Sequence, residues 1–217
     1  MNKSWQLLKK VWGIFVERVS RKGMFRRAEF FTSKIFYYFK GCETVLDLGC
    51  GSGHIGVTLA QKYNLKVTMI DTKPSLSCIG VRMLMEPCAR VLAQKHKLTH
   101  EIYDGRKLDS YDSEYDAVLL AFVLHHTESP EEVLNEVCRV AKKRIIILED
   151  IHRKWADRIL NPIADAVINL EIPGHQNRNR SEEEWKKTFI HFGLKVMHTE
   201  FWGGPFFPNT LFVLEKE

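Results

Sequence analysis

The sequence predicts an α/β domain built on a doubly wound, mostly parallel sheet. Short apolar segments alternate with amphipathic ones between residues 44 and 148, as strands do when helical crossovers join them. A cluster of glycines, from Gly49 to Gly56, separates the first apolar segment from the first helical one. The segment 115–122, YDAVLLAF, is apolar almost throughout, which is typical of a strand with helices on both faces. The 217 residues and the hydrophobic fraction of 45% suit one such domain.

The alternating part of the chain predicts five strands with helices between them. The strands are expected over residues 44–48, 65–70, 98–103, 115–122 and 144–148. The helices are expected over residues 54–63, 75–96 and 131–141. Pro87 should break or restart the second of these helices, because proline lacks an amide hydrogen. Ser129 and Pro130 should cap and begin the third.

The two ends of the chain depart from this alternation. Helices are expected over about residues 4–20 and 25–39 before the sheet, and over about 153–171 after the fifth strand. Ser181 and Glu184 have the spacing of a capping box, which predicts the start of another helix. Segments 194–201 and 210–214 then predict a terminal pair of antiparallel strands.

The composition argues against several classes of protein. The five cysteines are irregularly spaced and form no C-x-x-C pair, which disfavours a disulfide framework and a zinc site. No apolar run reaches the roughly 20 residues that span a bilayer. The first residues lack the apolar core and the cleavage site of a signal peptide. We therefore expect a cytoplasmic protein in a reducing environment.

The first 40 residues are strongly basic. They hold ten lysines and arginines against Glu17 and Glu29. An apolar stripe with helical spacing accompanies these charges, formed by Trp5, Leu8, Trp12 and Phe15. One hypothesis is a lid, residues 1–40, over a main domain of residues 41–217. The alternative is a peripheral contact of residues 1–22 with an anionic membrane. We favour the lid, because such stripes usually pack on protein.

The glycine cluster indicates a nucleotide-binding loop. From Gly51 it reads G-x-G-x-x-G, the dinucleotide fingerprint, and from Asp47 it reads D-x-G-x-G-x-G. Asp71 ends the second predicted strand about 20 residues further on, where an acid can accept hydrogen bonds from ribose hydroxyls. NAD and S-adenosylmethionine both fit these residues. Asp47 favours S-adenosylmethionine, because a carboxylate repels a pyrophosphate but attracts a cationic amino group. Asp104, after the third strand, could accept a hydrogen bond from an adenine amine.

Four stretches of the chain resemble the class I S-adenosylmethionine-dependent methyltransferases, especially their small-molecule branch. They are VLDLGCGSG, MID at 69–71, YDG at 103–105 and YDAVLLAFVLHH at 115–126. The resemblance covers about residues 40–217, including the late helix and the strands after it. It implies a Rossmann-like seven-stranded sheet of order 3-2-1-4-5-7-6, with the last strand antiparallel. It also implies S-adenosylmethionine as the cofactor.

The resemblance assigns a set of cofactor-binding residues. The expected residues are Asp47, Gly49, Gly51, Gly53, Asp71, Asp104, Gly105 and Ala121. It places Asp47 with the first glycines at the methionine part, Asp71 at the ribose, and Asp104 with Gly105 at the adenine. The chain departs from the family at RKLDSY after Asp104, where members often have Leu-Pro-Phe. This departure bears on the adenine position and not on the fold.

The side chains that could act on a methyl acceptor follow the fourth and fifth strands. His125 and His126 come directly after the fourth strand, and Glu149 and Asp150 end the fifth. Adjacent residues of an extended segment point to opposite sides, so at most one histidine is expected to face the substrate. The predicted catalytic residues are His126, His125 and Glu149, with His126 favoured as the general base and Glu149 as an orienting group. With His152 these side chains could also form a divalent-metal site, but no ligand spacing supports one and no metal is expected.

These observations predict methyl transfer to an oxygen, carbon or nitrogen of a small, apolar or aromatic molecule. Aromatic side chains that could line the acceptor pocket are Trp12, Phe30, Phe31, Trp155, His175, Trp202, Phe206 and Phe207. One alternative is a methyltransferase for protein or RNA, docked through the basic N-terminal segment. Another is a non-catalytic cofactor-binding or membrane-associated protein of the same fold. Nucleic acid is disfavoured, because LAFVLHH lacks the Asn/Asp-Pro-Pro-aromatic turn that aligns a flipped base. No oligomeric state is indicated.

Overall fold

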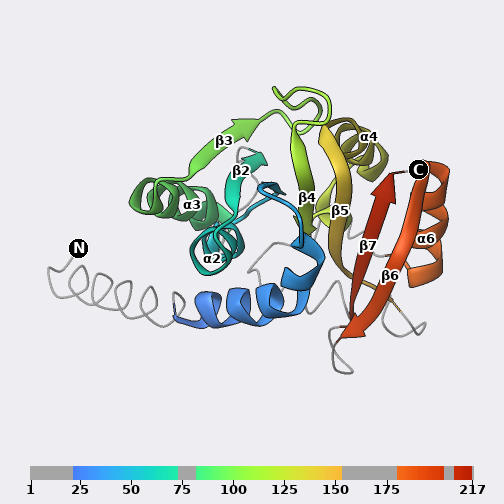
Figure 1. Ribbon diagram of the computed structural model, residues 1–217, viewed down its shortest axis with the longest axis horizontal. Coiled ribbons are helices and arrows are strands. Elements are labelled where there is room, and N and C mark those ends of the chain that lie inside the picture. The colour runs from blue at the N-terminus through green and yellow to red at the C-terminus, as the bar shows by residue number, and fades with distance from the viewer. Residues whose placement is uncertain (1–21, 73–81, 153–179, 203–207, 217) are drawn as a thin grey trace, which may run out of the picture.

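The computed structural model describes residues 22–72, 82–152, 180–202 and 208–216, and these contain a seven-stranded sheet (Figure 1). The strands are β1 (Thr44–Leu48), β2 (Lys66–Thr72), β3 (Thr99–Tyr103), β4 (Tyr115–Ala121), β5 (Ala141–Asp150), β6 (Leu194–Trp202) and β7 (Asn209–Lys216). Their order is β3-β2-β1-β4-β5-β7-β6, and β7 is antiparallel to both of its neighbours. The predicted fold class and strand order are therefore confirmed.

Helices cover both faces of this sheet (Figure 1). The helical segments are residues 22–35, η1 (Phe36–Phe39), α2 (His54–Tyr63), α3 (Arg82–His96), η2 (Leu124–His126), α4 (Pro130–Val140) and α6 (Glu182–His191). Successive residues of a strand point to opposite faces. Leu46 and Leu48 of β1 therefore pack in one core with α4 and α6. Val45, which precedes Leu46 and points to the other face, packs in a second core with residues 22–39, α2 and α3.

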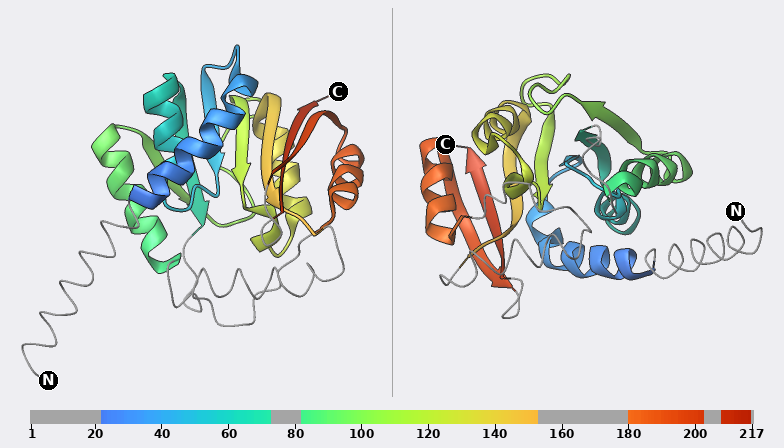
Figure 2. Two further views of the ribbon diagram at one scale, coloured as in Figure 1. Left: turned by 90° about the horizontal axis from the view of Figure 1, so that it is seen from below. Right: turned by 180° about the vertical axis from the view of Figure 1, so that it is seen from behind.

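The helix of residues 22–35, called here the N-terminal helix, lies across one face of the sheet and runs from near the carboxyl ends of the parallel strands toward their amino ends (Figure 2). Its side chains contact the segments that follow β1 and β4. The Phe25 ring lies edge-on to His54 at the start of α2, with ring centroids 4.5 Å apart. The Phe31 ring lies edge-on to Phe122 after β4, with centroids 5.1 Å apart. No helix in the described ranges is long and apolar enough to cross a membrane.

The structure corrects two local predictions. Pro87 does not break α3, which continues from Arg82 to His96. A proline removes only one backbone hydrogen bond, and the helix can continue where its other hydrogen bonds remain. The strand β5 begins at Ala141, directly after α4, where residue 144 had been expected. The exposed Lys142 and Lys143 give this first part of the strand no apolar signal. The helices expected over residues 4–20 and 153–171 lie outside the described residues.

The packing of the N-terminal helix leads to a stability prediction. Phe31 is 6% exposed within the second core, whereas its neighbour Phe30 is 52% exposed. Phe31→Ala should lower the free energy of unfolding by about 3–5 kcal/mol, because it leaves a cavity in a packed core. The matched control Phe30→Ala should change it by about 0.5 kcal/mol or less. Urea denaturation followed by circular dichroism measures both values, and equal losses would contradict the packing described here.

Candidate functional site

The glycine loop between β1 and α2 is a tight backbone turn. Gly49, Gly51 and Gly53 all have positive φ angles, of 73°, 54° and 77°, which residues with a side chain rarely adopt. The amides of Gly49 and Cys50 donate to the Ile70 carbonyl oxygen at 2.8 and 3.1 Å, which joins the loop to β2. A Cβ on Gly49 would lie 2.6 Å from a methyl carbon of Val123 in the loop after β4. The loop therefore approaches its neighbours more closely than a side chain would allow.

Asp71 lies at the carboxyl end of β2, opposite the glycine loop. Its Oδ2 accepts a hydrogen bond from the Gly51 amide at 2.6 Å. Its Oδ1 accepts one from the Thr72 amide at 2.7 Å. The predicted ribose acid and the predicted methionine loop are thus brought together by direct contact.

Asp47 is a buried acid next to the glycine loop, with 1% of its surface exposed. Within the described ranges, its Oδ2 has no hydrogen-bond partner. Gly56 makes room for it, because a Cβ there would lie 2.8 Å from Oδ2 and 2.8 Å from the Met69 sulfur. Burial, and then the Asp71 carboxylate, raise the pKa of Asp47 to about 7, although the Gly56 amide lowers it. Such a group attracts a cation or a hydrogen-bond donor.

Asp104 is an exposed acid that shapes its own turn. Its Oδ1 accepts hydrogen bonds from the amides of Lys107 and Arg106, at 2.9 and 2.8 Å. These two bonds lower the pKa of Asp104, and the carboxylate therefore stays ionised. Gly105 follows it with a φ of 85°, and a Cβ there would meet only Thr72, at 3.5 Å. The predicted adenine residues thus lie at the carboxyl ends of β3 and β2.

The segment after Asp104 is held by side chains of α4 that sequence reasoning missed. Glu136 accepts a hydrogen bond from the Leu108 amide at 2.7 Å. Arg139 donates to the Leu108 and Ser110 carbonyl oxygens at 3.0 and 2.6 Å, and it pairs with Glu136 at 2.7 Å. Leu108 itself is 1% exposed. Glu136 and Arg139 thus hold the segment RKLDSY against α4. In the sequence, only the i, i+3 spacing of these two charged residues could have suggested this contact.

Glu149, at the end of β5, is fully buried and holds the turn that follows β4. Its Oε1 accepts hydrogen bonds from the amides of Val123 and Leu124, at 3.0 and 2.6 Å. Its Oε2 pairs with Nδ1 of His125. His125 is itself 1% exposed. The contacts of Glu149 are therefore to the protein's own backbone and to one of the two predicted histidines.

His126 differs from His125 in its exposure. Both belong to η2, and their ring centroids are 3.9 Å apart. His126 is half-buried, whereas His125 is enclosed. Ala121, which ends β4 just before this turn, is also half-buried. The structure thus separates the pair into an enclosed histidine and an accessible one.

The acceptor side of the site includes a contact that the sequence did not indicate. Phe122 has a positive φ of 61°, and its amide donates to the Leu148 carbonyl oxygen at 2.8 Å. The Arg27 guanidinium of the N-terminal helix lies 5.0 Å from the centre of the Phe122 ring. Of the expected pocket aromatics, Phe31 lies 6.4 Å from Trp202 between ring centroids. The others are Phe30, which is exposed, and Trp12, Trp155, His175, Phe206 and Phe207, which lie outside the described residues.

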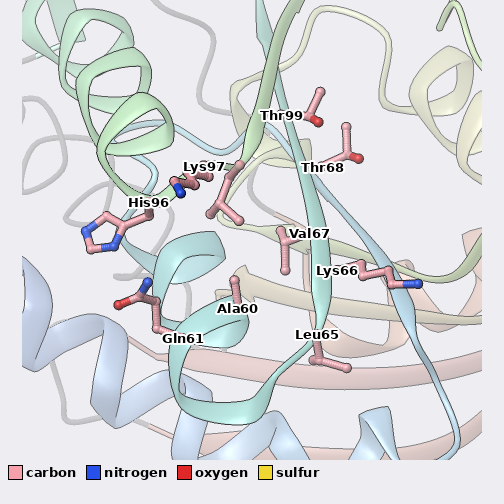
Figure 3. A pocket seen from close by; sticks show the side chains of 10 residues that line it. Ala60, Gln61, Leu65, Lys66, Val67, Thr68, His96, Lys97 and Thr99 are labelled. Carbon is pink, nitrogen blue, oxygen red and sulfur yellow. The ribbon is translucent and has the colours of Figure 1, made fainter.

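Two further features bear on what the site can hold. Among the residues that the structure describes, no group of three or more His, Cys, Asp or Glu side chains could hold a metal ion. A pocket of about 340 Å³ lies at the opposite edge of the sheet, where β2 and β3 begin (Figure 3). Lys66, Thr99 and Gln61 are among its lining residues. It is remote from the glycine loop and does not belong to the candidate site.

Comparison with known proteins agrees with this fold. A protein-family model described as a methyltransferase domain matches residues 45–144. Isoflavone 7-O-methyltransferase of Glycyrrhiza echinata is 29% identical over 171 residues, which are 72% of this chain and 42% of that protein. Ajmaline N-methyltransferase of Rauvolfia serpentina is 28% identical over 130 residues, which are 58% of this chain and 43% of that protein. The chain therefore spans less than half the length of these curated relatives.

A solved structure extends the likeness over nearly the whole chain. The crystal structure of magnesium protoporphyrin IX methyltransferase from Synechocystis PCC 6803 with bound SAH has a TM-score of 0.65. It is 20% identical and covers 94% of this chain and 88% of that one. Residues 45–144 are therefore similar to a methyltransferase domain, and the seven-stranded sheet has the fold of this solved S-adenosylmethionine-dependent enzyme.

The environment of Asp47 predicts how stability depends on pH. Its pKa rises from 3.8 to about 7 on folding, so between these values the folded protein binds a proton that the unfolded chain releases. Stability should therefore fall as the pH rises from about 4 to about 7. Asp47→Asn should remove this fall and stabilise the ligand-free protein above pH 7, by a few kcal/mol at most. Thermal unfolding at several pH values measures both effects. The exposed control Asp109→Asn should leave the pH dependence unchanged, and a similar slope in the Asp47→Asn protein would contradict the assignment.

Proposed function

We propose that this protein transfers the methyl group of S-adenosylmethionine to an oxygen, carbon or nitrogen of a small, apolar or aromatic molecule. The observation that carries the proposal is the buried Asp47 carboxylate, whose Oδ2 lacks a hydrogen-bond partner within the described residues. A pyrophosphate would be repelled by this group, whereas the amino group of a methionine moiety would neutralise it. The relatives named as O- and N-methyltransferases of small molecules support the choice of acceptor class.

The residues at the carboxyl edge fit this cofactor part by part. Asp47 would face the amino group, and the backbone of Gly49, Gly51 and Gly53, which all have positive φ angles, would lie against the methionine chain. Asp71 would accept from the ribose hydroxyls. Asp104 and Gly105 would meet the adenine, and Ala121, at the end of β4, would also contact the cofactor. When bound, S-adenosylmethionine supplies an electrophilic methyl group on a sulfonium.

The two histidines and Glu149 have different roles in this proposal. Glu149 is a positioning residue, because its carboxylate holds the Val123 and Leu124 amides and the His125 ring. The enclosed His125 stiffens the turn. The half-buried His126 is the side chain that can accept a proton from a hydroxyl or amine acceptor, at one of its imidazole nitrogens. In this proposal the predicted catalytic set consists of one base, His126, and two residues, His125 and Glu149, that hold the turn on which it lies.

The N-terminal helix supports the predicted lid of residues 1–40. Phe31 and Arg27 both contact Phe122, directly after the strand whose end carries the histidines. A helix in this place would exclude water from the reacting centre and help to align the acceptor. Because Phe31 also belongs to the core, the described part of the segment would act as a fixed wall of the acceptor site.

Cofactor affinity should depend on Asp71. Asp71→Ala removes a charged acceptor of hydrogen bonds, which is worth about 1.5–3 kcal/mol, or a tenfold to hundredfold loss of affinity. Isothermal titration calorimetry with S-adenosylmethionine and with NAD measures the effect. Asp109→Ala, an exposed acid outside the site, is the control. Unchanged affinity in a folded Asp71→Ala protein would remove the ribose assignment, and tighter binding of NAD would overturn the choice of cofactor.

Turnover should separate the two histidines. With transfer of a radiolabelled methyl group to phenolic and amine acceptors, His126→Ala should lower turnover by roughly 10²–10⁴ and leave cofactor affinity nearly intact. It should also abolish the loss of turnover at acidic pH that protonation of the base causes in the parent protein. His125→Ala and Glu149→Gln should mainly lower the melting temperature and keep that pH dependence. The opposite ranking would make His125 the base, and small effects of both would leave alignment as the source of catalysis.

A further inference from the structure

The N-terminal helix has a second face that the fold does not use. Arg26, Phe30 and Lys34 recur at every fourth residue, and Tyr37 in η1 continues the stripe. All four side chains are exposed, and we call this stripe the outer face. The inward residues, which are 0–6% exposed, are Ala28, Phe31, Ile35 and Phe39. Only one side of the N-terminal helix and η1 packs into the core, and the outer face remains in contact with solvent.

The outer face combines positive charge with large exposed rings. Residues 22–40 hold five basic side chains against the single acid Glu29, and all five are exposed. Phe30 is 52% exposed and Tyr37 is 72% exposed. The exposed aromatic residues of the described chain are Phe30, Phe36, Tyr37, Tyr111 and Phe201, so three of the five fall within this one segment. Rings and cations are thus concentrated on the same surface.

We propose that the outer face docks lengthwise on an anionic lipid membrane. Helices that lie in the plane of a membrane interface carry basic residues beside exposed aromatic and aliphatic ones, as this one does. The lysines and arginines attract acidic headgroups, while the rings enter the boundary between headgroups and acyl chains. The sequence of residues 1–21 has the same character, with Lys9, Lys10, Trp5 and Trp12 among its members.

Docking in this way would place the membrane beside the candidate site. The N-terminal helix covers one face of the sheet and begins near its carboxyl edge (Figure 2). Its inward Phe31 contacts Phe122, directly after β4. An apolar acceptor dissolved in the bilayer would therefore reach the site over a short path. This last consequence rests on the proposed methyl transfer, but membrane docking itself does not.

Vesicle sedimentation of the 217-residue chain without cofactor tests the docking. Vesicles of phosphatidylcholine with phosphatidylglycerol should bind the protein at low salt about tenfold or more better than vesicles of phosphatidylcholine alone. High salt should abolish most of this preference, because it screens the charges. Equal binding to both kinds of vesicle, or none to either, would overturn the proposal. Because no methyl transfer is measured, failure of the proposed function would leave this result unaffected.

Variants of the outer face separate its rings and charges from the rest of the surface. Phe30→Ser with Tyr37→Ser should weaken binding to the anionic vesicles about tenfold or more, because two apolar insertions are lost. Arg26→Glu with Lys34→Glu should weaken it similarly and reduce its salt dependence. The controls are Tyr111→Ser, at a ring that is 84% exposed elsewhere, and Lys187→Glu with Lys195→Glu on α6 and β6.

The pattern across these variants decides the outcome. Full binding by the controls with loss in both outer-face variants, at unchanged melting temperature, supports the proposal. Equal loss in the controls would indicate a general charge effect and overturn it. So would unchanged binding of the Phe30→Ser, Tyr37→Ser protein. Tighter binding of a single-stranded RNA than of anionic vesicles, lost in the same variants, would assign the face to nucleic acid instead.

Discussion

Parallel pairing collects the carboxyl ends of β1 to β5 at one edge of the sheet, and acidic residues stand at or just after four of these ends. Three of the four acids are compensated by backbone amides. Asp71 accepts a hydrogen bond from the Gly51 amide, and Asp104 accepts one from an amide of its own turn. Glu149 accepts one from an amide of the turn after β4. Asp47 is the most enclosed of the cofactor acids, and its Oδ2 has no such bond within the described residues. The edge is therefore built to meet a ligand that brings a positive charge.

The turn after β4 connects this charge pattern to the acceptor side. Both carboxylate oxygens of Glu149, at the end of β5, form hydrogen bonds with η2 and the residue before it. Val123, whose amide it holds, also lies against Gly49, so the glycine loop and the histidine turn share one wall. A change in either would displace the other. This coupling is the physical reason for treating the cofactor and acceptor residues as a single site.

The N-terminal helix has two uses in the structure. Its inward residues complete a hydrophobic core and contact Phe122, and in the proposed function they form a wall of the acceptor site. Its outer face carries basic and aromatic side chains that are exposed to solvent. A lid and a membrane contact, which compete as explanations of the sequence alone, are compatible once the two faces are assigned separately. One helix can close the site on one side and meet a lipid surface on the other.

The sequence by itself determined the α/β class, the glycine loop and the acids at the strand ends, because all of these depend on local patterns. Hydrophobic period, glycine spacing and the capping box at Ser181 are readable within a few residues. Only the tertiary structure decided which histidine is enclosed, that Glu149 holds the turn after β4, and that Arg139 holds the segment after Asp104. These contacts join residues far apart in the chain, and their geometry depends on how the strands pair. The start of β5 at Ala141 was also visible only in the structure, because the exposed lysines that follow it give the sequence no apolar pattern.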